Sequence, residues 1–303
     1  MASRAIRFFS FTLLLFYLLS QVHSEHKSPI PSRFFIRNLQ GSHKGDKGNG
    51  ILVLRNYLQR FGYLSCITME QTTVQNDIFD DELESALKTY QQFYNLKPTG
   101  ILDEETVLQM TKPRCGVPDI INGTNPFHSQ YVFFPGNPKW TKNSLTYAFA
   151  PGTRRDGISA VSSALQKWAG KTRFKFSLTN DYSNADLKIS FQRLEHGDFA
   201  PFDGPGGVLA HATSPMDGTL HYDGDENWSL EATPGTFHLE TVGLHEIGHM
   251  LGLAHSQVGE AIMFASIGES EVKGLQEDDI NGILNLDKDT STLRPAPNST
   301  HTI

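Results

Sequence analysis

The sequence predicts two folded units, a small three-helix domain followed by a larger α/β (α+β) domain in which strands and helices are interspersed. Apolar residues recur at helical spacing up to residue 112, whereas strand-like and helix-like segments alternate from residue 139 onwards. The segment between them, residues 113–138, is rich in Pro, Gly and Asn and is typical of an exposed, cleavable connector. A chain of 303 residues has room for two ordinary domains, each with its own core.

The composition excludes several classes of protein. With 38% hydrophobic and 11% aromatic residues, the chain does not fit a disordered acidic protein. It carries 26 Lys and Arg against 33 Asp and Glu, so there is no basic excess to neutralise phosphates, and no nucleic acid is expected as a partner. Two cysteines are too few for a disulfide scaffold. The 12 histidines are the feature that needs an explanation.

Residues 1–24 have the pattern of a secretory signal peptide. Arg4 and Arg7 supply positive charge, an apolar run of about a dozen residues follows, and small Ser24 precedes the expected cleavage site. That run is shorter than the ~20 residues needed to span a bilayer, which makes a signal anchor the weaker alternative. We therefore expect a soluble, secreted protein in the extracellular space, the apoplast or the cell wall.

The C-terminal residues 288–303 are expected to form a flexible tail. They are polar and rich in Pro, Ser and Thr, and they lack the apolar segment of a GPI signal. No other segment is apolar enough to cross a membrane, so no transmembrane segment is expected. Three residues stand in N-glycosylation sequons and are candidate glycosylation sites: Asn122, Asn227 and Asn298.

The small domain is predicted over residues 30–112. Its first helix covers residues 51–61, with apolar side chains on one face and a glycine after the end. A second helix covers residues 82–95 after an acidic start, and a third covers residues 103–110 after a Lys-Pro-Thr-Gly turn. By composition alone, this segment fits a plain helical bundle.

The larger domain is predicted from strands, helices and a long loop system. Alternating apolar and polar residues predict strands at residues 144–149, 173–178 and 186–191. Helical spacing predicts helices at residues 159–168, 239–253 and 278–286. Residues 196–225 are rich in Gly, Asp and His, a composition typical of ligand-binding loops.

The segment His245-Glu246-Ile247-Gly248-His249 has the pattern H-E-x-x-H on a predicted helix. Residues four apart lie on one face, so both imidazoles can bind one ion while Glu246 reaches the water beside it. Gly252 then allows the chain to end the helix and turn, which brings His255 to the same ion. Three protein nitrogens and an open fourth position are typical of a catalytic zinc. Three core histidines at this spacing by chance are the weaker alternative.

With these residues, the chain closely resembles the matrix metalloproteinases, the matrixin branch of the metzincins. Residues 261–264 (Ala-Ile-Met-Phe) resemble the Met-turn that follows the third histidine in that family. The segment Pro113-Arg114-Cys115-Gly116-Val117-Pro118-Asp119 matches the family's cysteine-switch motif. The resemblance implies that Cys115 is the fourth zinc ligand of a latent form and excludes the catalytic water. Arg114 is expected to pair with Asp119 and hold this loop in shape.

The resemblance also implies the domain organisation. A signal peptide (1–24) precedes an inhibitory propeptide (25–130), whose three-helix bundle is similar to peptidoglycan-binding modules. A metzincin-type catalytic domain with a twisted mixed sheet and a zinc helix follows (131–287), and then the flexible tail. The segment Phe133-Phe134-Pro135-Gly136, with neither propeller-like repeats after the catalytic domain nor a fibronectin-like insert, looks most like the plant matrixins.

By resemblance, the loop system holds further metal ions. The implied ligands of a structural zinc are His196, Asp198, His211 and His221. The implied calcium ligands, which include backbone carbonyls of the glycines and the valine, are Asp203, Gly204, Gly206, Val208, Asp223 and Glu226. Asp186 is a candidate ligand of a second calcium. The expected cofactors are therefore two zinc ions, one catalytic and one structural, and calcium.

The function implied by the resemblance is that of a secreted metalloendopeptidase made as a latent zymogen. Zinc-bound water attacks the peptide carbonyl of extracellular protein substrates, including the extracellular matrix, with Glu246 as general base and acid. Substrate is expected to add as a strand along Leu209 and Ala210 and to place a hydrophobic P1′ side chain beside Thr241 and Val242. The propeptide is the expected inhibitor, and a monomer is the default.

Two residues depart from the family pattern. Ala265 stands where the family usually has proline, and this change is expected to loosen the wall of the specificity pocket. Cys66 lies outside the switch motif and could pair with Cys115, although an unpaired thiol is the favoured interpretation. Two other classes stay open at this point. An intact Glu246 argues against a non-catalytic binding protein, and an open zinc position argues against a metal-stabilised structural protein.

Overall fold

The structure, a computed structural model, describes residues 33–65, 77–121, 123 and 131–288. The predicted signal peptide, the predicted tail, Cys66 and two of the sequon asparagines, Asn122 and Asn298, lie outside the described residues. None of the helices in the described part of the chain is both long enough and apolar enough to cross a membrane.

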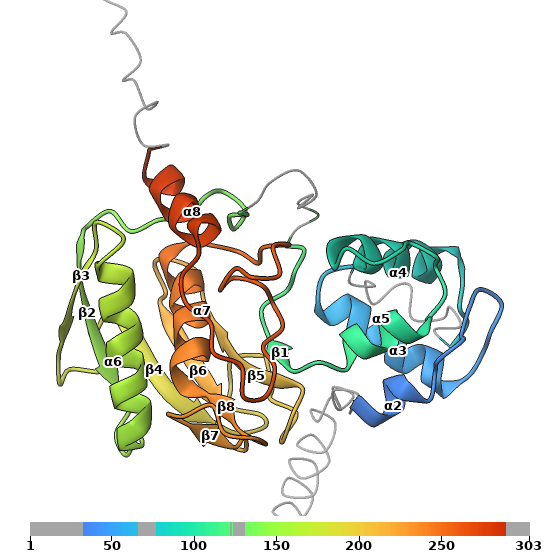
Figure 1. The fold of residues 1–303 in the computed structure, drawn as a ribbon, viewed down its shortest axis with the longest axis horizontal. Helices are drawn as coiled ribbons and strands as arrows, with labels where there is room; N and C mark the ends of the chain where they lie inside the picture. Colours follow the sequence, from blue (N-terminus) through green and yellow to red (C-terminus); the bar gives the residue numbers. More distant parts are fainter. Residues whose placement is uncertain (1–32, 66–76, 122, 124–130, 289–303) are drawn as a thin grey trace, which may run out of the picture. The chain divides into compact units, whose positions relative to one another are not determined.

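The N-terminal part is a helical domain, as predicted (Figure 1). Its helices are α2 (Arg33–Arg37), α3 (Asn49–Arg60), α4 (Asp81–Phe93) and α5 (Glu104–Met110). The short helix α2 is additional to the three that the sequence predicts. Helices α4 and α5 begin where they do because the carboxylates of Asp80 and Asp103 accept hydrogen bonds from the free backbone N–H groups of their first turns.

The larger domain contains a six-stranded sheet in the order β1-β5-β6-β4-β2-β3 (Figure 1). The strands are β1 (Arg114–Cys115), β2 (Ser144–Phe149), β3 (Lys175–Leu178), β4 (Leu187–Gln192), β5 (Val208–Ala212) and β6 (Thr219–Asp223). Strand β5 pairs antiparallel with β6 and every other pair is parallel, so the predicted mixed sheet is confirmed. A separate two-stranded sheet joins β7 (Trp228–Ser229) and β8 (Phe237–His238).

The prediction of an uninterrupted loop system over residues 196–225 is wrong, because β5 and β6 lie within it. All five residues of β5 are buried, so the strand has no alternation of apolar and polar residues by which to recognise it. The loop assignment holds for the segment before β5 and for the connection between β5 and β6.

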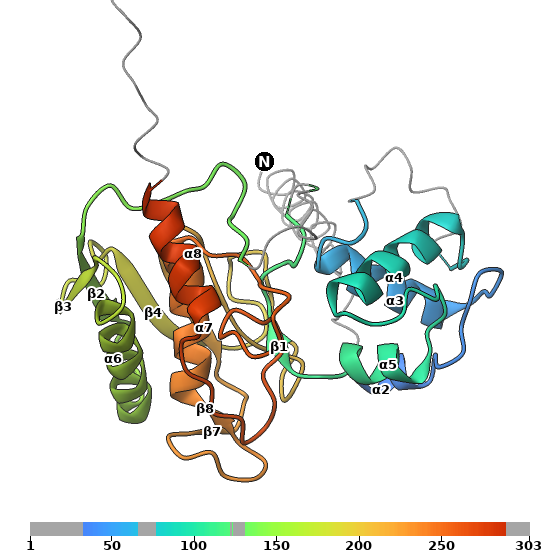
Figure 2. The same ribbon diagram turned by 45° about the horizontal axis from the view of Figure 1, so that its top comes forward.

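Three helices complete this domain. Helices α6 (Arg155–Ala169) and α7 (Leu239–Leu251) pack side by side against the sheet (Figure 1). The indole N–H of Trp168 on α6 donates to the carbonyl of Leu244 on α7 at 2.9 Å, which ties the two helices together. Helix α8 (Glu277–Lys288) packs where α7 ends, with Leu286 against Gly252 (Figure 2). These contacts hold the middle and the C-terminal end of α7, the helix that carries the H-E-x-x-H pattern.

Residues 113–119, which carry the cysteine-switch motif and are called the switch segment below, lie between two parts of the larger domain. The backbone N–H of Arg114 donates to Gly207 and that of Gly116 to Ala210, on the β5 side. On the other side, the N–H of Cys115 donates to the carbonyl of Ala265 at 2.9 Å. The segment therefore occupies an edge of β5 as an added strand, parallel to it.

Candidate metal centre

Helix α7 presents His245 and His249 on one face, and its end places His255 beside them. The helix ends at Leu251, two residues before the predicted end, because Gly252 adopts a left-handed conformation with a φ of 115°. Space also requires a glycine here, since a Cβ would lie 2.5 Å from the Leu286 side chain. The sharp turn that follows brings His255 back to the face of α7.

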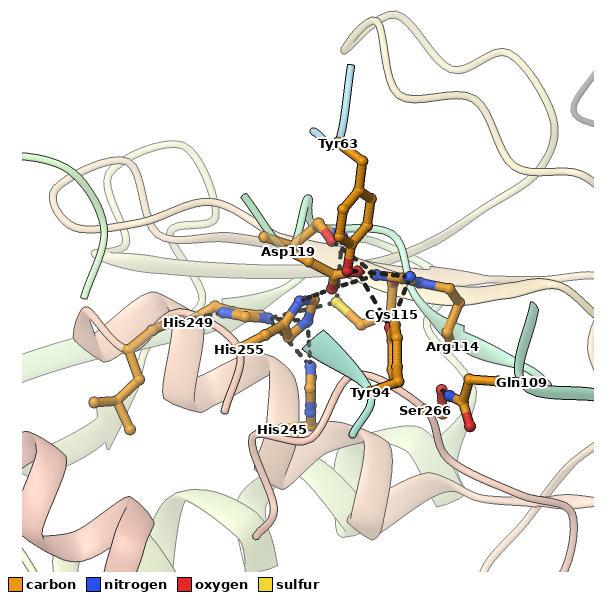
Figure 3. A network of polar contacts seen from close by, with 12 residues as sticks. Tyr63, Tyr94, Gln109, Arg114, Cys115, Asp119, His245, His249, His255 and Ser266 are labelled. Atoms are coloured by element: carbon orange, nitrogen blue, oxygen red, sulfur yellow. Dashed lines mark hydrogen bonds and ion pairs between the residues drawn. The ribbon is translucent and has the colours of Figure 1, made fainter. Parts of the chain in front are cut away.

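The side chain of Cys115 joins those of the three histidines, and all four converge on one point, as Figure 3 shows. Their Nε2 atoms are 3.1 Å apart for the pair His245 and His249, and 3.3 Å apart for each pair with His255. The Sγ atom of Cys115 lies 3.4 Å from Nε2 of His249. A tetrahedral zinc with bonds of ~2.0–2.3 Å requires ligand separations of about 3.3–3.7 Å. The geometry therefore fits zinc with the thiol as the fourth ligand.

Burial sets the protonation of this site. Burial lowers the pKa of His245, His249 and His255, which keeps the imidazoles neutral, as metal ligands must be. Burial, and secondarily Glu246, raises the pKa of the Cys115 thiol, so a thiolate here needs a cation beside it.

Glu246 is one of several buried polar groups for which the described residues provide no hydrogen-bond partner, and it is the one beside the three histidines. The residue is fully buried, and neither of its carboxylate oxygens has a hydrogen-bond partner among the described residues. Burial raises its pKa to about 8, with the Cys115 thiol acting in the opposite direction. A buried carboxyl group without partners costs free energy, so its place beside three imidazoles is a functional signal.

The switch loop is held by a buried ion pair. As the sequence predicts, Arg114 pairs with Asp119, at 2.7 Å from Nη2 to Oδ1 and 3.0 Å from Nη1 to Oδ2. The guanidinium also lies 3.5 Å from the centre of the Phe61 ring and donates to the carbonyl of Cys115. These contacts hold the switch segment against the helical domain and place the Cys115 thiol beside the three histidines.

Comparisons with known proteins agree with this geometry. The family model described as Matrixin matches residues 139–287, and that of a putative peptidoglycan binding domain matches residues 47–110. The chain is 45% identical over 273 residues to Metalloendoproteinase 5-MMP of Arabidopsis thaliana, covering 82% of this chain and 74% of the relative. It is 44% identical over 260 residues to Metalloendoproteinase 1 of Glycine max, covering 80% and 84%. The chain belongs to the matrixin family.

This matrixin is therefore a metalloendopeptidase, and zinc is the metal that the family implies for the three-histidine group. Stromelysin-1 of Rattus norvegicus is 39% identical over 254 residues, which cover 80% of this chain and 50% of that protein. The predictions of a matrixin fold and of a resemblance to plant matrixins are confirmed.

A second group of four side chains meets beside strands β5 and β6, which carry two of them. His196, Asp198, His211 and His221 place their ligand atoms around one point, as the sequence predicts. One oxygen of Asp198 lies 2.7 Å from Nε2 of His211 and 2.9 Å from Nδ1 of His221. The rings of His196 and His211 stack on Phe202, which shields one side of the group. Three imidazoles and one carboxylate are a typical closed zinc set.

The predicted calcium loop has the tight turns that a calcium site needs, and hydrogen bonds between its own residues stabilise it. Gly204 and Gly206 have positive φ, and the N–H groups of Gly206 and Val208 donate to the carboxylates of Glu226 and Asp203. Burial raises the pKa values of Asp203 and Asp223 to about 6 each, and one oxygen of Asp223 is buried without a partner. A cation would relieve both costs.

Asp186 has a different environment from the one that the sequence predicts. One of its oxygens lies 2.7 Å from Nζ of Lys142, and the other accepts hydrogen bonds from the backbone and hydroxyl of Thr146. Both oxygens already have partners, so the structure gives no support for Asp186 as a ligand of a second calcium.

The predicted substrate residues lie around the switch segment. Leu209 and Ala210 are in β5, next to the edge that the switch segment occupies. Thr241 and Val242 are fully buried in α7, and the Thr241 hydroxyl accepts a hydrogen bond from the N–H of Lys273. Ala265, at the position where the family usually has proline, is completely buried, and its carbonyl accepts a hydrogen bond from the N–H of Cys115.

Asp279 is a buried residue whose role the sequence does not reveal. Its carboxylate accepts hydrogen bonds from the backbone N–H groups of Ile262 and Met263, in the Met-turn, and of Gln276. In the sequence, an acidic pair at the start of α8 indicates only the beginning of a helix. The structure shows that this carboxylate fixes the turn beneath the histidines.

Replacing Asp279 by alanine is expected to lower the free energy of unfolding by about 3 kcal/mol, because it leaves buried N–H groups unpaired. Urea unfolding followed by tryptophan fluorescence measures this loss. Asp278→Ala is the matched control, since Asp278 makes one hydrogen bond, to the Ser256 hydroxyl, and about 1 kcal/mol is expected. Equal stability of the two variants would contradict this role of Asp279.

Proposed function

We propose that this matrixin is a secreted zinc endopeptidase made as a latent zymogen, in which residues 25–130 inhibit the catalytic domain. The observation that carries the proposal is the free, buried thiol of Cys115, whose sulfur completes a tetrahedral set with His245, His249 and His255. A thiolate in that place excludes water from the metal, so the enzyme cannot act until the switch segment leaves.

We infer the reaction from the residues around this group. Zinc, when bound, supplies Lewis acidity that polarises a peptide carbonyl and makes a water acidic enough to give up its proton near neutral pH. The Glu246 carboxylate accepts that proton as general base and then donates it to the leaving amine. Its lack of other partners leaves both oxygens available for this exchange. The two backbone carbonyls that accept from Nδ1 of His245 and His249 fix those rings in place.

The substrate position follows from that of the switch segment. The edge of β5 that pairs with residues 114–116 becomes free when the propeptide leaves, and a peptide substrate would pair with Leu209 and Ala210 there. The P1′ side chain would then enter the domain between α7, at Thr241 and Val242, and the segment around Ala265. These are apolar or small surroundings, which favour a hydrophobic P1′ residue in extracellular protein substrates.

The test of this function is the hydrolysis of a quenched fluorescent peptide with a hydrophobic P1′ residue by the purified full-length chain. We expect no cleavage at first, and cleavage after treatment with a thiol-modifying agent. A zinc chelator should abolish this cleavage. Hydrolysis that persists in the chelator, or its complete absence after thiol modification, would refute the proposal.

The second histidine group is proposed to hold a structural zinc, and the loop of Asp203, Asp223 and Glu226 to hold calcium. Full-length protein is expected to contain two zinc ions per chain, and His211→Ala is expected to contain one, because a closed tetrahedral site loses a ligand. Metal analysis after gel filtration measures the ratio. His238→Ala is the control, since its nitrogens bind Thr241 and the Leu230 carbonyl instead. One zinc in the wild-type protein would contradict the structural site.

Secretion is proposed from residues 1–24 and from an exposed sequon. Asn227 is exposed beside β7, so a glycosyltransferase can reach its side chain. Protein expressed through a secretory pathway is expected in the medium, to begin near Glu25, and to lose one glycan in Asn227→Gln. Mass spectrometry of the secreted protein decides both points, and retention inside the cell would contradict secretion.

A further inference from the structure

The three histidines of the metal centre differ in what holds their outer nitrogens. Nδ1 of His245 lies 2.7 Å from the carbonyl of Ile262, and Nδ1 of His249 lies 2.7 Å from the carbonyl of Leu253. Nδ1 of His255 instead lies 2.8 Å from a carboxylate oxygen of Asp119. Figure 3 shows Asp119 beside His255. The first two partners lie in the proposed catalytic domain, whereas Asp119 lies in the proposed propeptide.

The direction of this third hydrogen bond follows from the geometry. Nε2 of His255 faces the other two Nε2 atoms at 3.3 Å, so it is the nitrogen that would bind the metal. The Nδ1 atom must then carry the proton and donate it to Asp119. A carboxylate in this position fixes the tautomer and the ring plane of a metal-binding histidine and makes its other nitrogen a better ligand.

Asp119 is held rigidly enough to do this. The residue is fully buried, and its other contacts are with Arg114, the hydroxyl of Tyr63 at 2.7 Å and the hydroxyl of Tyr94 at 3.2 Å. The Arg114 guanidinium pairs with both oxygens of Asp119, and Nδ1 of His255 lies against one of them. The carboxylate is therefore held in place from both sides.

We propose that Asp119 is a positioning residue for the catalytic metal, so that the propeptide contributes a carboxylate behind His255 in addition to the thiol of Cys115. The latent enzyme then holds zinc more tightly than the mature enzyme for two separate reasons. Removal of the propeptide withdraws both groups at once and returns Nδ1 of His255 to solvent. This inference rests on the proposed zinc function of the three-histidine group.

Zinc release from the full-length chain tests the proposal. Every variant carries Glu246→Ala, so that no variant can cleave its own propeptide, and a chromogenic chelator reports the rate of release. Adding Asp119→Asn is expected to speed release by about 10–100-fold, the usual effect of losing an outer partner of a metal ligand. Asn preserves the volume and removes the charge. Tyr63→Phe is the matched control. It removes a hydrogen bond that the Tyr63 hydroxyl donates to Oδ2 of Asp119, and it leaves Oδ1, the oxygen that faces His255, unchanged.

A second set of variants separates the effect of Asp119 on zinc release from the effect of the Cys115 thiol. Asp119→Asn could act by undocking Cys115, so the same comparison is made in chains that also carry Cys115→Ser. We expect the same fold-change there, because the effect passes through His255. An unchanged release rate in the Cys115→Ser background would overturn the proposal, as would equal acceleration by Tyr63→Phe.

The NMR signals of the imidazole N–H protons provide a second measurement. A purely structural role of Asp119 would not change the signal of His255 alone. The Nδ1 proton of His255, bonded to a carboxylate, is expected to resonate downfield, and Asp119→Asn should shift this one signal while those of His245 and His249 stay. Three unchanged signals would overturn the proposal. His255→Ala is expected to remove zinc from the parent chain. If it removes none, the proposed function fails. If the parent chain binds zinc but Asp119→Asn changes nothing, only this further inference fails.

Discussion

Replacing Glu246 by alanine is expected to slow peptide hydrolysis by about 10²–10⁴-fold, the usual contribution of a general base. Both oxygens of Glu246 lack a partner among the described residues, so no hydrogen bond of the fold is lost with them. The zinc content should stay unchanged because the three histidines are intact. The measurement compares turnover of a quenched fluorescent peptide, after the same thiol modification of both proteins, with metal analysis of each.

Two further variants separate base catalysis from packing. Glu246→Gln keeps the volume of the side chain and cannot accept the proton, so it should be as slow as the alanine variant. Glu240→Ala, at the start of the same helix, removes an ion pair with Lys167 and should keep most of the turnover. Wild-type-like activity of Glu246→Gln would exclude this residue as the base.

Replacing Cys115 by serine is expected to convert the latent chain into an active, self-processing enzyme. Removing one partner of a buried, charged pair typically costs about 3–5 kcal/mol, which raises the fraction of molecules with an open site by more than about 10²-fold. The backbone hydrogen bonds of residues 114–116 and the contact of Asp119 with His255 remain, and they must hold the segment in place without the thiol. Peptide turnover by untreated protein, followed over time with gel analysis of the chain length, measures the change.

The other cysteine provides the control for this experiment. Cys66→Ser removes the same chemical group from outside the switch motif and is expected to stay latent until a thiol-modifying agent is added. Activity of untreated Cys66→Ser would mean that the second thiol takes part in latency. A Cys115→Ser chain that stays latent would show that the backbone contacts, not the thiol, block the site.

The sequence by itself determined the chemistry of this protein, because the decisive residues are close together in the chain. Five residues, His245, Glu246, His249, Gly252 and His255, specify a helix face, a turn and a third ligand through local geometry alone. The switch motif is equally local, and its predicted Arg114–Asp119 pair is present in the structure. Helices were found for the same reason, since their spacing recurs every turn.

Strand β5 shows why the sheet was harder to predict. It is buried on both sides, so its sequence Val-Leu-Ala-His-Ala contains no alternation, and its histidine made the segment look like a ligand-binding loop. Its position in the sheet depends partly on β1, a strand that lies far before it in the sequence.

The tertiary structure alone decided how the metal centre is supported. Asp119 and His255 are 136 positions apart, and Gln109 reaches Ser266 from 157 positions away. No periodicity or motif links such residues, because their contact depends on how two domains pack. The three histidines can therefore be identified from the local sequence. The contact of Asp119 with His255 and the contacts of Asp279 with the Met-turn are found only when the folded chain brings distant segments together.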